Sequence, residues 1–347
     1  MPLQSNARFL RAIAREPTDC TPIWIMRQAG RYLPQYRATR ARAGSFMTLC
    51  KTPELAAEVT LQPLQCYALD AAIIFSDILT IPDAMGLGLQ VIESKGPVFS
   101  HPVQDEKSIL HLTLPDPAKL AYVYDAIKLV QRELAGRIPL IGFCGSPWTL
   151  AAYMVEGKSM PGFPLIHEMK EKTPALLHQL LSLLAKAVTQ HLLGQIQAGV
   201  QTVMLFDTWG GLLNTQDYEA FSLYYLREIV QALNQSVPVI LFTKKGGQWL
   251  SQMADTGCDV IGIDWETSLT DARKIVGTRV ALQGNMDPAI LLSDPSTIRK
   301  EVARLLAAYG HGSGHIFNLG HGITPDVPPE HVQVLVDTVH ELSLPYH

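Results

Sequence analysis

The sequence lacks the cysteine patterns that indicate a disulfide framework or a zinc site. Its five cysteines are scattered, and no Cys-X-X-Cys or His-X-Cys pair occurs. An odd number of isolated cysteines is typical of reduced structural thiols. We therefore expect a cytoplasmic protein with no disulfide and no metal.

A secretory signal and a membrane span are also missing. Residues 1–17 mix arginines with apolar side chains and have no uninterrupted apolar core of the signal-peptide kind. The longest apolar stretch, residues 175–196, is interrupted by two histidines, three glutamines and a lysine. A buried amphipathic helix tolerates that density of polar groups and a membrane span does not, so we expect no membrane partner.

Charge is sparse and unevenly placed. Charged residues make up 17% of the 347 residues and the net charge is −4, which argues against nucleic acid as a partner. Residues 1–51 nevertheless carry nine arginines and lysines against two acidic residues, a net of +7. Such a segment can be a nucleic-acid arm or a pocket for an anionic ligand. Interleaved large apolar residues such as Phe9, Trp24 and Tyr32 indicate that it is folded.

Eight short apolar runs recur along the chain, each followed by a stretch with helical features. They span residues 23–26, 71–75, 139–143, 202–206, 238–242, 260–263, 280–282 and 315–319. Near-continuous apolar runs are typical of strands buried on both faces of a parallel sheet. Helices are predicted from Pro174 to Gly199 and from Pro295 to Gly310, since glycine is the expected terminator. No linker divides the chain, so residues 1–347 are predicted to form one domain.

The alternation fits a closed barrel or an open doubly wound sheet. A Rossmann-type sheet should carry a glycine fingerprint after its first strand, and none is present. The glycine-rich segment 310–314 precedes a strand, and we interpret it as a helix-to-strand turn. We therefore predict an α/β fold, a (β/α)8 TIM barrel, with an N-terminal basic segment and a β-hairpin insertion near residues 83–103.

In such barrels the active site is built from loops at the carboxyl ends of the strands. The polar residues just past the runs are Arg27, Ser76, Asp77, Ser146, Asp207, Thr208, Lys244, Lys245, Asp264, Gln283, Asn285 and His321. We expect them to converge on one rim, although some will cap the helices that follow.

Arg27, Arg31 and His321 carry a specific chemical argument. Arg27 and Arg31 flank Gly30, and guanidinium forks match carboxylates in bidentate geometry. Their apolar surroundings favour a carboxylate clamp over a solvated surface. His321 lies between two glycines, which would permit a ligand to approach the backbone closely. Asp77 also lies on the predicted rim, but its carboxylate can serve as a turn cap instead of binding a ligand.

Five motifs together resemble the uroporphyrinogen decarboxylase family of haem biosynthesis. They are MRQAGRYLP (26–34), FSDIL (75–79), YMVEG (153–157), LQGNMD (282–287) and NLGHGI (318–323). The similarity runs from about Arg8 to the C-terminus. It implies a (β/α)8 barrel, a homodimer, and an enzyme that converts uroporphyrinogen III to coproporphyrinogen III by removing four acetate carboxyl groups as CO2. It also implies that no metal or other cofactor is needed.

The resemblance also assigns site residues. The substrate-binding positions of the family fall on Arg27, Gln28, Ala29, Gly30, Arg31, Asp77, Tyr153, Thr208 and His321. Thr208 stands where other members carry serine, and the hydroxyl donor is kept. Gln35 and Lys245 are mild departures from the family pattern. We expect catalytic roles for Asp77 and Arg27.

The expected chemistry needs an electron sink, which a pyrrole protonated at carbon can itself provide. The protein would then stabilise a cation and position the acid groups. Our hypothesis is that the Asp77 carboxylate accepts the pyrrole N–H groups and offsets that cation. Two alternatives stay open. A zinc-dependent methyltransferase would need a His-X-Cys ligand set that is missing, and a non-catalytic tetrapyrrole-binding protein would show no turnover.

Overall fold

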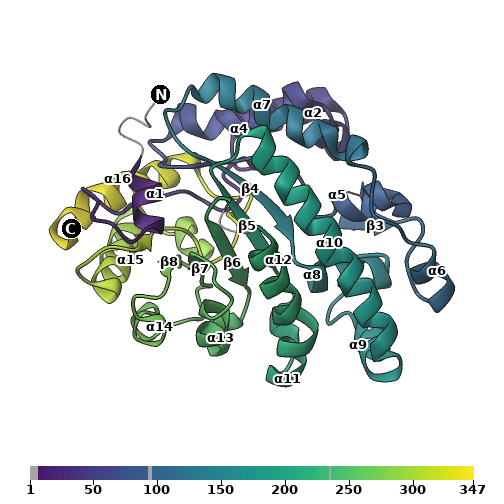
Figure 1. Cartoon of the computed structure of the whole chain (residues 1–347). Coiled ribbons are helices and arrows are strands. Elements are labelled where there is room, and N and C mark those ends of the chain that lie inside the picture. The colour runs from purple at the N-terminus through teal and green to yellow at the C-terminus, as the bar shows by residue number, and fades with distance from the viewer. Residues whose placement is uncertain (1–6, 93–95, 234–235) are drawn as a thin grey trace.

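A seven-stranded parallel sheet forms the centre of the molecule in the computed structural model, which describes residues 7–92, 96–233 and 236–347 (Figure 1). The sheet runs in the order β1 (Ala72–Ile73), β4 (Leu140–Gly145), β5 (Thr202–Asp207), β6 (Val239–Thr243), β7 (Val260–Gly262), β8 (Ala281–Gln283) and β9 (His315–Ile316). Every neighbouring pair is parallel, from Ala72 opposite Leu140 to Leu282 opposite His315. Seven of the eight predicted runs therefore form strands of one curled sheet.

The first predicted run, residues 23–26, is wrong as a strand, because only Ile23 forms an isolated bridge, to Phe317. Its backbone nevertheless joins both edges of the sheet. The Phe317 N–H donates to the Pro22 carbonyl at 2.8 Å, and the Asp70 N–H, just before β1, donates to the Ile23 carbonyl at 2.8 Å. A tight turn at residues 25–28 ends the extended backbone after three residues, so an irregular segment takes the eighth position of the barrel.

Helices follow the strands and surround the sheet in a TIM-barrel-like arrangement (Figure 1). They are α1 (Ala7–Ile13), α2 (Pro34–Ala43), α3 (Phe46–Lys51), α4 (Pro53–Cys66), α5 (Thr80–Pro82), α6 (Glu106–Leu110), α7 (Ala121–Leu134), α8 (Pro147–Glu156), α9 (Pro164–Lys172), α10 (Pro174–Ala198), α11 (Thr215–Tyr218), α12 (Tyr224–Leu233), α13 (Leu250–Ala254), α14 (Leu269–Val276), α15 (Pro295–Tyr309) and α16 (Pro329–Ser343). Short 3₁₀ or π segments are η1 (Asp83–Leu87), η2 (Pro117–Leu120), η3 (Gly210–Leu212), η4 (Glu219–Leu223), η5 (Gly246–Trp249), η6 (Pro288–Leu292) and η7 (Leu344–Tyr346).

The predicted helix ends are confirmed where glycine follows. Helix α10 ends at Ala198 with Gly199 as its cap, and α15 ends at Tyr309 with Gly310 as its cap. Residues 310–314 then lead into β9, as predicted for a helix-to-strand turn. In the part of the chain that the structure describes, no helix has the length and apolar character needed to cross a membrane.

The predicted hairpin is confirmed over a shorter range. Strands β2 (Leu89–Ile92) and β3 (Gly96–Phe99) pair antiparallel, with Leu89 opposite Phe99. Residues 93–95, between them, lie outside the described residues. The prediction is wrong for residues 83–87, which continue the helical backbone of α5 as η1. There the Asp83 N–H donates to the Leu79 carbonyl at 3.1 Å, which extends the helix by a turn before the hairpin begins.

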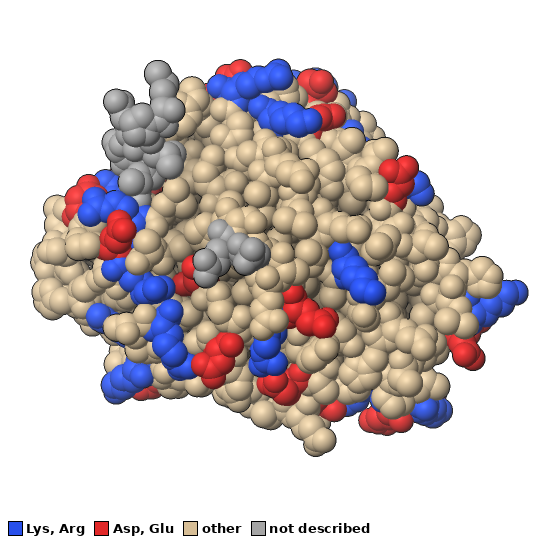
Figure 2. Space-filling view, in the orientation of Figure 1, with Lys and Arg blue, Asp and Glu red and all other residues tan. Residues whose placement is uncertain are grey.

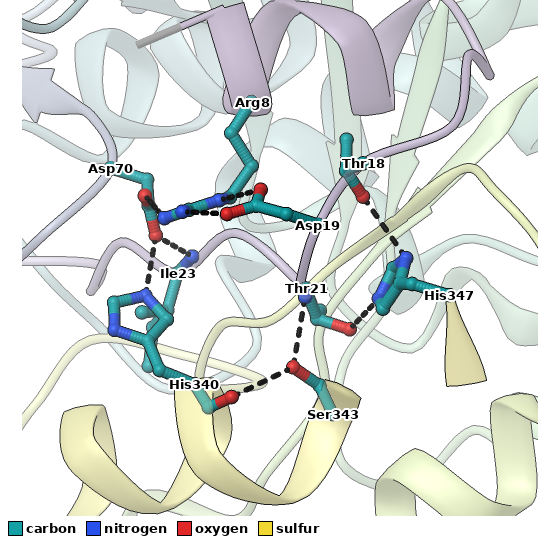
Figure 3. A network of polar contacts seen from close by, with 9 residues as sticks. All are labelled: Arg8, Thr18, Asp19, Thr21, Ile23, Asp70, His340, Ser343 and His347. Atoms are coloured by element: carbon teal, nitrogen blue, oxygen red, sulfur yellow. Dashed lines mark hydrogen bonds and ion pairs between the residues drawn. The ribbon is translucent and has the colours of Figure 1, made fainter. Parts of the chain in front are cut away.

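The N-terminal segment is anchored to the C-terminal helix at the amino end of the barrel (Figure 3). Arg8 donates to both carboxylate oxygens of Asp19, at 2.7 and 2.5 Å, and its Nη1 donates to Asp70 Oδ1 at 2.6 Å. Asp70 Oδ2 accepts the Ile23 N–H and pairs with His340 Nε2 of α16, each at 2.8 Å. Residues at this end of a barrel serve stability. One arginine of the basic segment therefore has a structural partner.

Candidate active site

A cavity of about 190 Å³ opens among the carboxyl ends of the first strands. Its wall comes from the turn before α2, the segment after β1, the ends of β4 and β5, and the loop after β9. The lining residues are Met26, Arg27, Ala29, Ile73, Ile74, Phe75, Ser76, Asp77, Ile78, Phe143, Phe206, Thr208 and His321. Most of this wall is apolar, with few polar groups, which is the usual composition of a small-molecule site.

Arg27 is aimed into this cavity by a tight turn. The Gln28 N–H donates to the Ile25 carbonyl at 2.8 Å, and Arg27 adopts a left-handed backbone with φ of 66°. Such backbone angles are uncommon outside glycine and cluster at functional sites. The side chain is accessible through the open cavity, although the surrounding walls displace water from it. This burial lowers the pKa of Arg27, whereas the charge of Asp77 raises it.

Asp77 follows β1 and faces the same cavity. Its Oδ1 accepts the Leu79 N–H at 2.8 Å, so the expected turn cap is present. Burial raises the pKa of Asp77, whereas the Leu79 N–H and the charge of Arg27 lower it. The charges of Asp77 and Arg27 thus interact without a direct ion pair between the two side chains. A carboxylate and a guanidinium are both presented to whatever enters the cavity.

His321 lines the cavity beside Arg27. Burial and, to a smaller extent, the charges of Arg27 and Lys244 together lower the pKa of His321 to about 4, so the imidazole is neutral near pH 7. The flanking glycines, predicted to permit close approach of a ligand, also permit close packing within the protein. A Cβ on Gly322 would lie 2.3 Å from Arg27 Cδ, and one on Gly320 would lie 2.3 Å from the Trp265 nitrogen. The two glycines therefore allow the loop after β9 to pack closely against Arg27 and the backbone of Trp265.

The other predicted residues fall into two groups. Ala29 and Thr208 line the cavity. Tyr153 lies on α8, its ring packed edge-on against Phe163 and Trp209, and it does not line the cavity. Burial raises the pKa of Tyr153, which keeps its hydroxyl protonated, and the charges of Asp77 and Arg27 act on that pKa as well. The ring is therefore within electrostatic reach of the cavity.

Three residues of the predicted binding stretch 27–31 do not line the cavity. Arg31 is exposed. Its charge lowers the pKa of Arg27, but this effect is smaller than those of burial and of other charges. The Gln28 side chain is buried instead. Its Nε2 donates to the Ala71 carbonyl at 3.3 Å, and its Oε1 accepts the Ile25 N–H at 3.2 Å. Gly30 packs against the turn itself. Gln28 and Gly30 therefore shape the turn that aims Arg27.

Several rim residues hold the scaffold together instead of facing the cavity. The fully buried Asp207 carboxylate accepts hydrogen bonds from the hydroxyl groups of four residues in three segments of the chain, which are Ser146, Thr149, Ser222 and Thr243. Asp264 accepts the Lys245 N–H at 2.5 Å and the Thr267 hydroxyl at 2.8 Å. The Lys245 side chain lines a separate groove with Gln248 and Glu266. These contacts fix the loops that carry Thr208 and Lys244.

The aromatic wall of the cavity was missed from the sequence. Phe143 and Phe206 lie in apolar runs that predict buried strands, yet they line the cavity with their rings 5.6 Å apart in an edge-on contact. Both are in the last part of their strands, where an inward-pointing side chain reaches the rim. Their position near the carboxyl end of a predicted strand was the sequence signal that could have identified them as cavity residues. Within residues 7–92, 96–233 and 236–347, no three His, Cys, Asp or Glu side chains gather as a metal site.

Comparison with known proteins agrees with the motifs. The family model described as uroporphyrinogen decarboxylase (URO-D) matches residues 4–342. The chain is 59% identical over 348 residues to the uroporphyrinogen decarboxylase of Escherichia coli O7:K1, covering 99% of this chain and 98% of that protein. The enzyme of Escherichia fergusonii is similar at the same identity and coverage.

Solved structures agree on the fold. A methyltransferase from Methanosarcina mazei superposes with a TM-score of 0.82 at 22% identity, covering 97% of this chain and 98% of that one. A B12-independent methionine synthase from a Shewanella species superposes with a TM-score of 0.57 at 10% identity, covering 84% and 86%. At such low identity these similarities concern the fold alone.

Proposed function

Since the chain belongs to the uroporphyrinogen decarboxylase family, we propose that its cavity binds uroporphyrinogen III and that the enzyme removes the four acetate carboxyl groups to yield coproporphyrinogen III and CO2. The protein is a carboxy-lyase. The observation that carries the assignment of the site is the pair Asp77 and Arg27, which face one largely apolar cavity without being bonded to each other. The methyltransferase alternative is not favoured.

Each decarboxylation needs somewhere for an electron pair to go. Protonation of a pyrrole carbon makes the ring cationic, the bond between the acetate methylene and its carboxyl group breaks, and the electron pair flows into the ring as CO2 leaves. A proton then adds to the methylene carbon to give a methyl group, and the ring carbon releases the proton it had gained, which restores the neutral pyrrole. The protein's main task is to stabilise the cation with a fixed negative charge, since such preorganised groups stabilise a transition state strongly.

Asp77 supplies that charge in our proposal. Its carboxylate accepts the pyrrole N–H groups of the macrocycle and offsets the positive charge of the protonated ring. Arg27 and Arg31 bind substrate carboxylates through their guanidinium forks. The apolar side chains Ile73 and Phe206 offer contact to the faces of the pyrrole rings.

The remaining predicted residues bind the periphery of the substrate. Thr208 and Tyr153 donate hydrogen bonds to peripheral acids. A neutral His321 can donate to an acid from one ring nitrogen and relay a proton through the other. Ala29 contributes no polar group and leaves room beside Arg27.

We further propose a single domain over residues 1–347, a homodimer in solution and a cytoplasmic location. The assignment of a single domain is supported by the span of the family match, residues 4–342. Size-exclusion chromatography with light scattering tests the dimer: a mass near twice 38.2 kDa is expected.

The decisive assay is anaerobic incubation with uroporphyrinogen III, followed by oxidation and chromatography of the porphyrins. We expect products with seven, six, five and finally four carboxyl groups. If the substrate binds and no product with fewer carboxyl groups forms, the protein is a tetrapyrrole-binding protein and the proposed activity is rejected.

A further inference from the structure

Lys244 occupies a place on the rim that the assigned site does not use. It follows β6, which lies four positions around the eight-membered ring from the segment 22–24 that precedes Arg27. The two cations therefore come from opposite sides of the barrel. The Lys244 N–H donates to the Asp207 carbonyl at 3.3 Å. A Cβ on Gly211 would lie 2.2 Å from the Lys244 carbonyl oxygen, so η3 packs tightly against this backbone.

The ammonium group of Lys244 has no acidic partner. Its Nζ lies 5.8 Å from the centre of the Trp265 ring, and within the described residues it forms no ion pair or hydrogen bond. Other lysines without a partner in the described part of the chain are exposed, whereas Lys244 is half-buried. Removing an ammonium group partly from water is unfavourable unless an anion compensates. The contact with the indole ring supplies only part of that compensation.

Two ring contacts connect the Lys244 ammonium group to the cavity, the first of them its contact with Trp265. The Trp265 ring stands edge-on to the His321 ring with centres 6.3 Å apart, and His321 lines the cavity. The Lys244 charge also acts on His321, because it contributes to lowering the pKa of His321. The cavity has a volume of about 190 Å³. A tetrapyrrole is larger than this, so we expect some of its acid side chains to extend beyond the cavity toward the rim.

We propose that Lys244 binds a peripheral carboxylate of the substrate, across the barrel from Arg27. This inference rests on the proposed function and adds to it a third cationic contact. Two cations on opposite sides would hold acid groups from different pyrrole rings, which orients the macrocycle over Asp77. Lys244 takes part in binding and not in the transfer of a proton.

Three variants test the role: Lys244→Gln, Lys244→Arg and, as a matched control, Lys245→Gln. The control removes the same charge from the next residue, whose side chain lines the separate groove. Each variant is assayed anaerobically with uroporphyrinogen III, at steady state and in single turnovers with enzyme in excess. The enzyme concentration that gives half of the maximal single-turnover rate reports binding, and the maximal rate reports the chemistry.

For Lys244→Gln we expect kcat/KM to fall about 10- to 100-fold, the range for losing one hydrogen bond to a charged group. The loss should lie in binding, with little change in the maximal single-turnover rate. Lys244→Arg should restore most of the affinity because it keeps the charge, and Lys245→Gln should behave like the wild type. Thermal unfolding should show that all three variants are folded.

Wild-type affinity in Lys244→Gln would overturn the inference, as would an equal loss in Lys245→Gln or in Lys244→Arg. A fall in the maximal single-turnover rate with unchanged binding would also overturn it. Absence of turnover in the wild type would reject the proposed function instead, so the two failures are distinguishable.

Discussion

At the scale of single residues, Asp77 uses one carboxylate oxygen for a structural hydrogen bond and leaves the other available to a ligand. One carboxylate oxygen is held by the Leu79 N–H, which fixes the orientation of the side chain. The other oxygen has no hydrogen-bond partner within the described residues, and Asp77 lines the cavity. Burial raises the pKa of Asp77, so its ionised form gains from donors that a ligand brings.

Asp77→Asn should therefore lose activity without losing the fold. The amide oxygen can still accept the Leu79 N–H, but the negative charge is gone. We expect kcat to fall on the order of 100-fold or more, the usual result of removing an electrostatic stabiliser. Asp83→Asn is the control, because Asp83 lies outside the cavity and pairs with Lys51 at 2.6 Å. Near-wild-type activity of Asp77→Asn would refute the central role of Asp77.

Arg31 is predicted to act through binding. Its guanidinium is exposed, and Arg37 fixes the local backbone by donating to the Arg31 carbonyl at 2.7 Å. Arg31→Gln should raise KM about tenfold or more, as expected for losing a hydrogen bond to a charged group. Arg42→Gln, which removes a surface ion pair with Glu58, should leave KM unchanged. A large fall in kcat with unchanged KM would contradict a clamp role for Arg31.

At the scale of elements, the loop after β9 links the fold to the site through two glycines. Gly322 lies against the flexible side chain of Arg27, whereas Gly320 lies against the backbone of Trp265. A side chain can move out of the way of a new methyl group at a smaller cost than a packed backbone can. The same substitution should therefore have different consequences at the two positions.

Gly320→Ala should destabilise the protein by about 1–3 kcal/mol, the usual range for overpacking, as measured by urea unfolding. Gly322→Ala should cost less stability but displace Arg27, and a displacement of about 1 Å can reduce the rate on the order of 100-fold. Anaerobic activity assays and unfolding curves of both variants test this contrast. Equal losses of stability and activity in the two variants would contradict it.

At the scale of the whole molecule, the basic excess of residues 1–51 is divided among several tasks. Arg8 pairs with Asp19 and Asp70, and Arg42 pairs with Glu58. On the face shown in Figure 2, basic and acidic side chains lie interspersed around the edge and across the lower half. Arg27 alone of these arginines lines the cavity, within the described residues. The net charge of residues 1–51 therefore overstates the positive charge that the substrate meets in the cavity.

Two fully buried histidines should make stability depend on pH. Burial lowers the pKa of His191 to about 4, and it does the same for His315. In the unfolded chain the histidine pKa is about 6.5. The unfolded state then binds more protons between these values. The stabilisation is complete above about pH 6.5 and is lost as the pH falls toward 4.

Each of these histidines should contribute a loss of about 2 kcal/mol between pH 7 and pH 5. His191→Gln removes one of the two titrating groups. Urea unfolding at both pH values should show that the variant loses about 2 kcal/mol less than the wild type over this interval. An equal loss in both proteins would show that His191 does not titrate in this way.

The sequence by itself determined the order of the elements and the family. Apolar runs marked seven of the eight barrel positions as strands, and Gly199 and Gly310 marked the ends of two helices, because these signals depend on neighbours within a few residues. The segment 23–26 was predicted as a strand but is an irregular connection. Its two hydrogen-bonded partners lie near residues 70 and 317, far from it in the sequence.

Only the tertiary structure decided which rim residues face the cavity. Asp77 and Asp207 both follow apolar runs and look alike in the sequence. Hydroxyl groups from three segments of the chain enclose Asp207, whereas Asp77 is left open beside Arg27. Gln28 likewise turns inward to the Ala71 carbonyl. The environment of a side chain depends on residues that the chain brings together only on folding, and local sequence pattern does not contain that information.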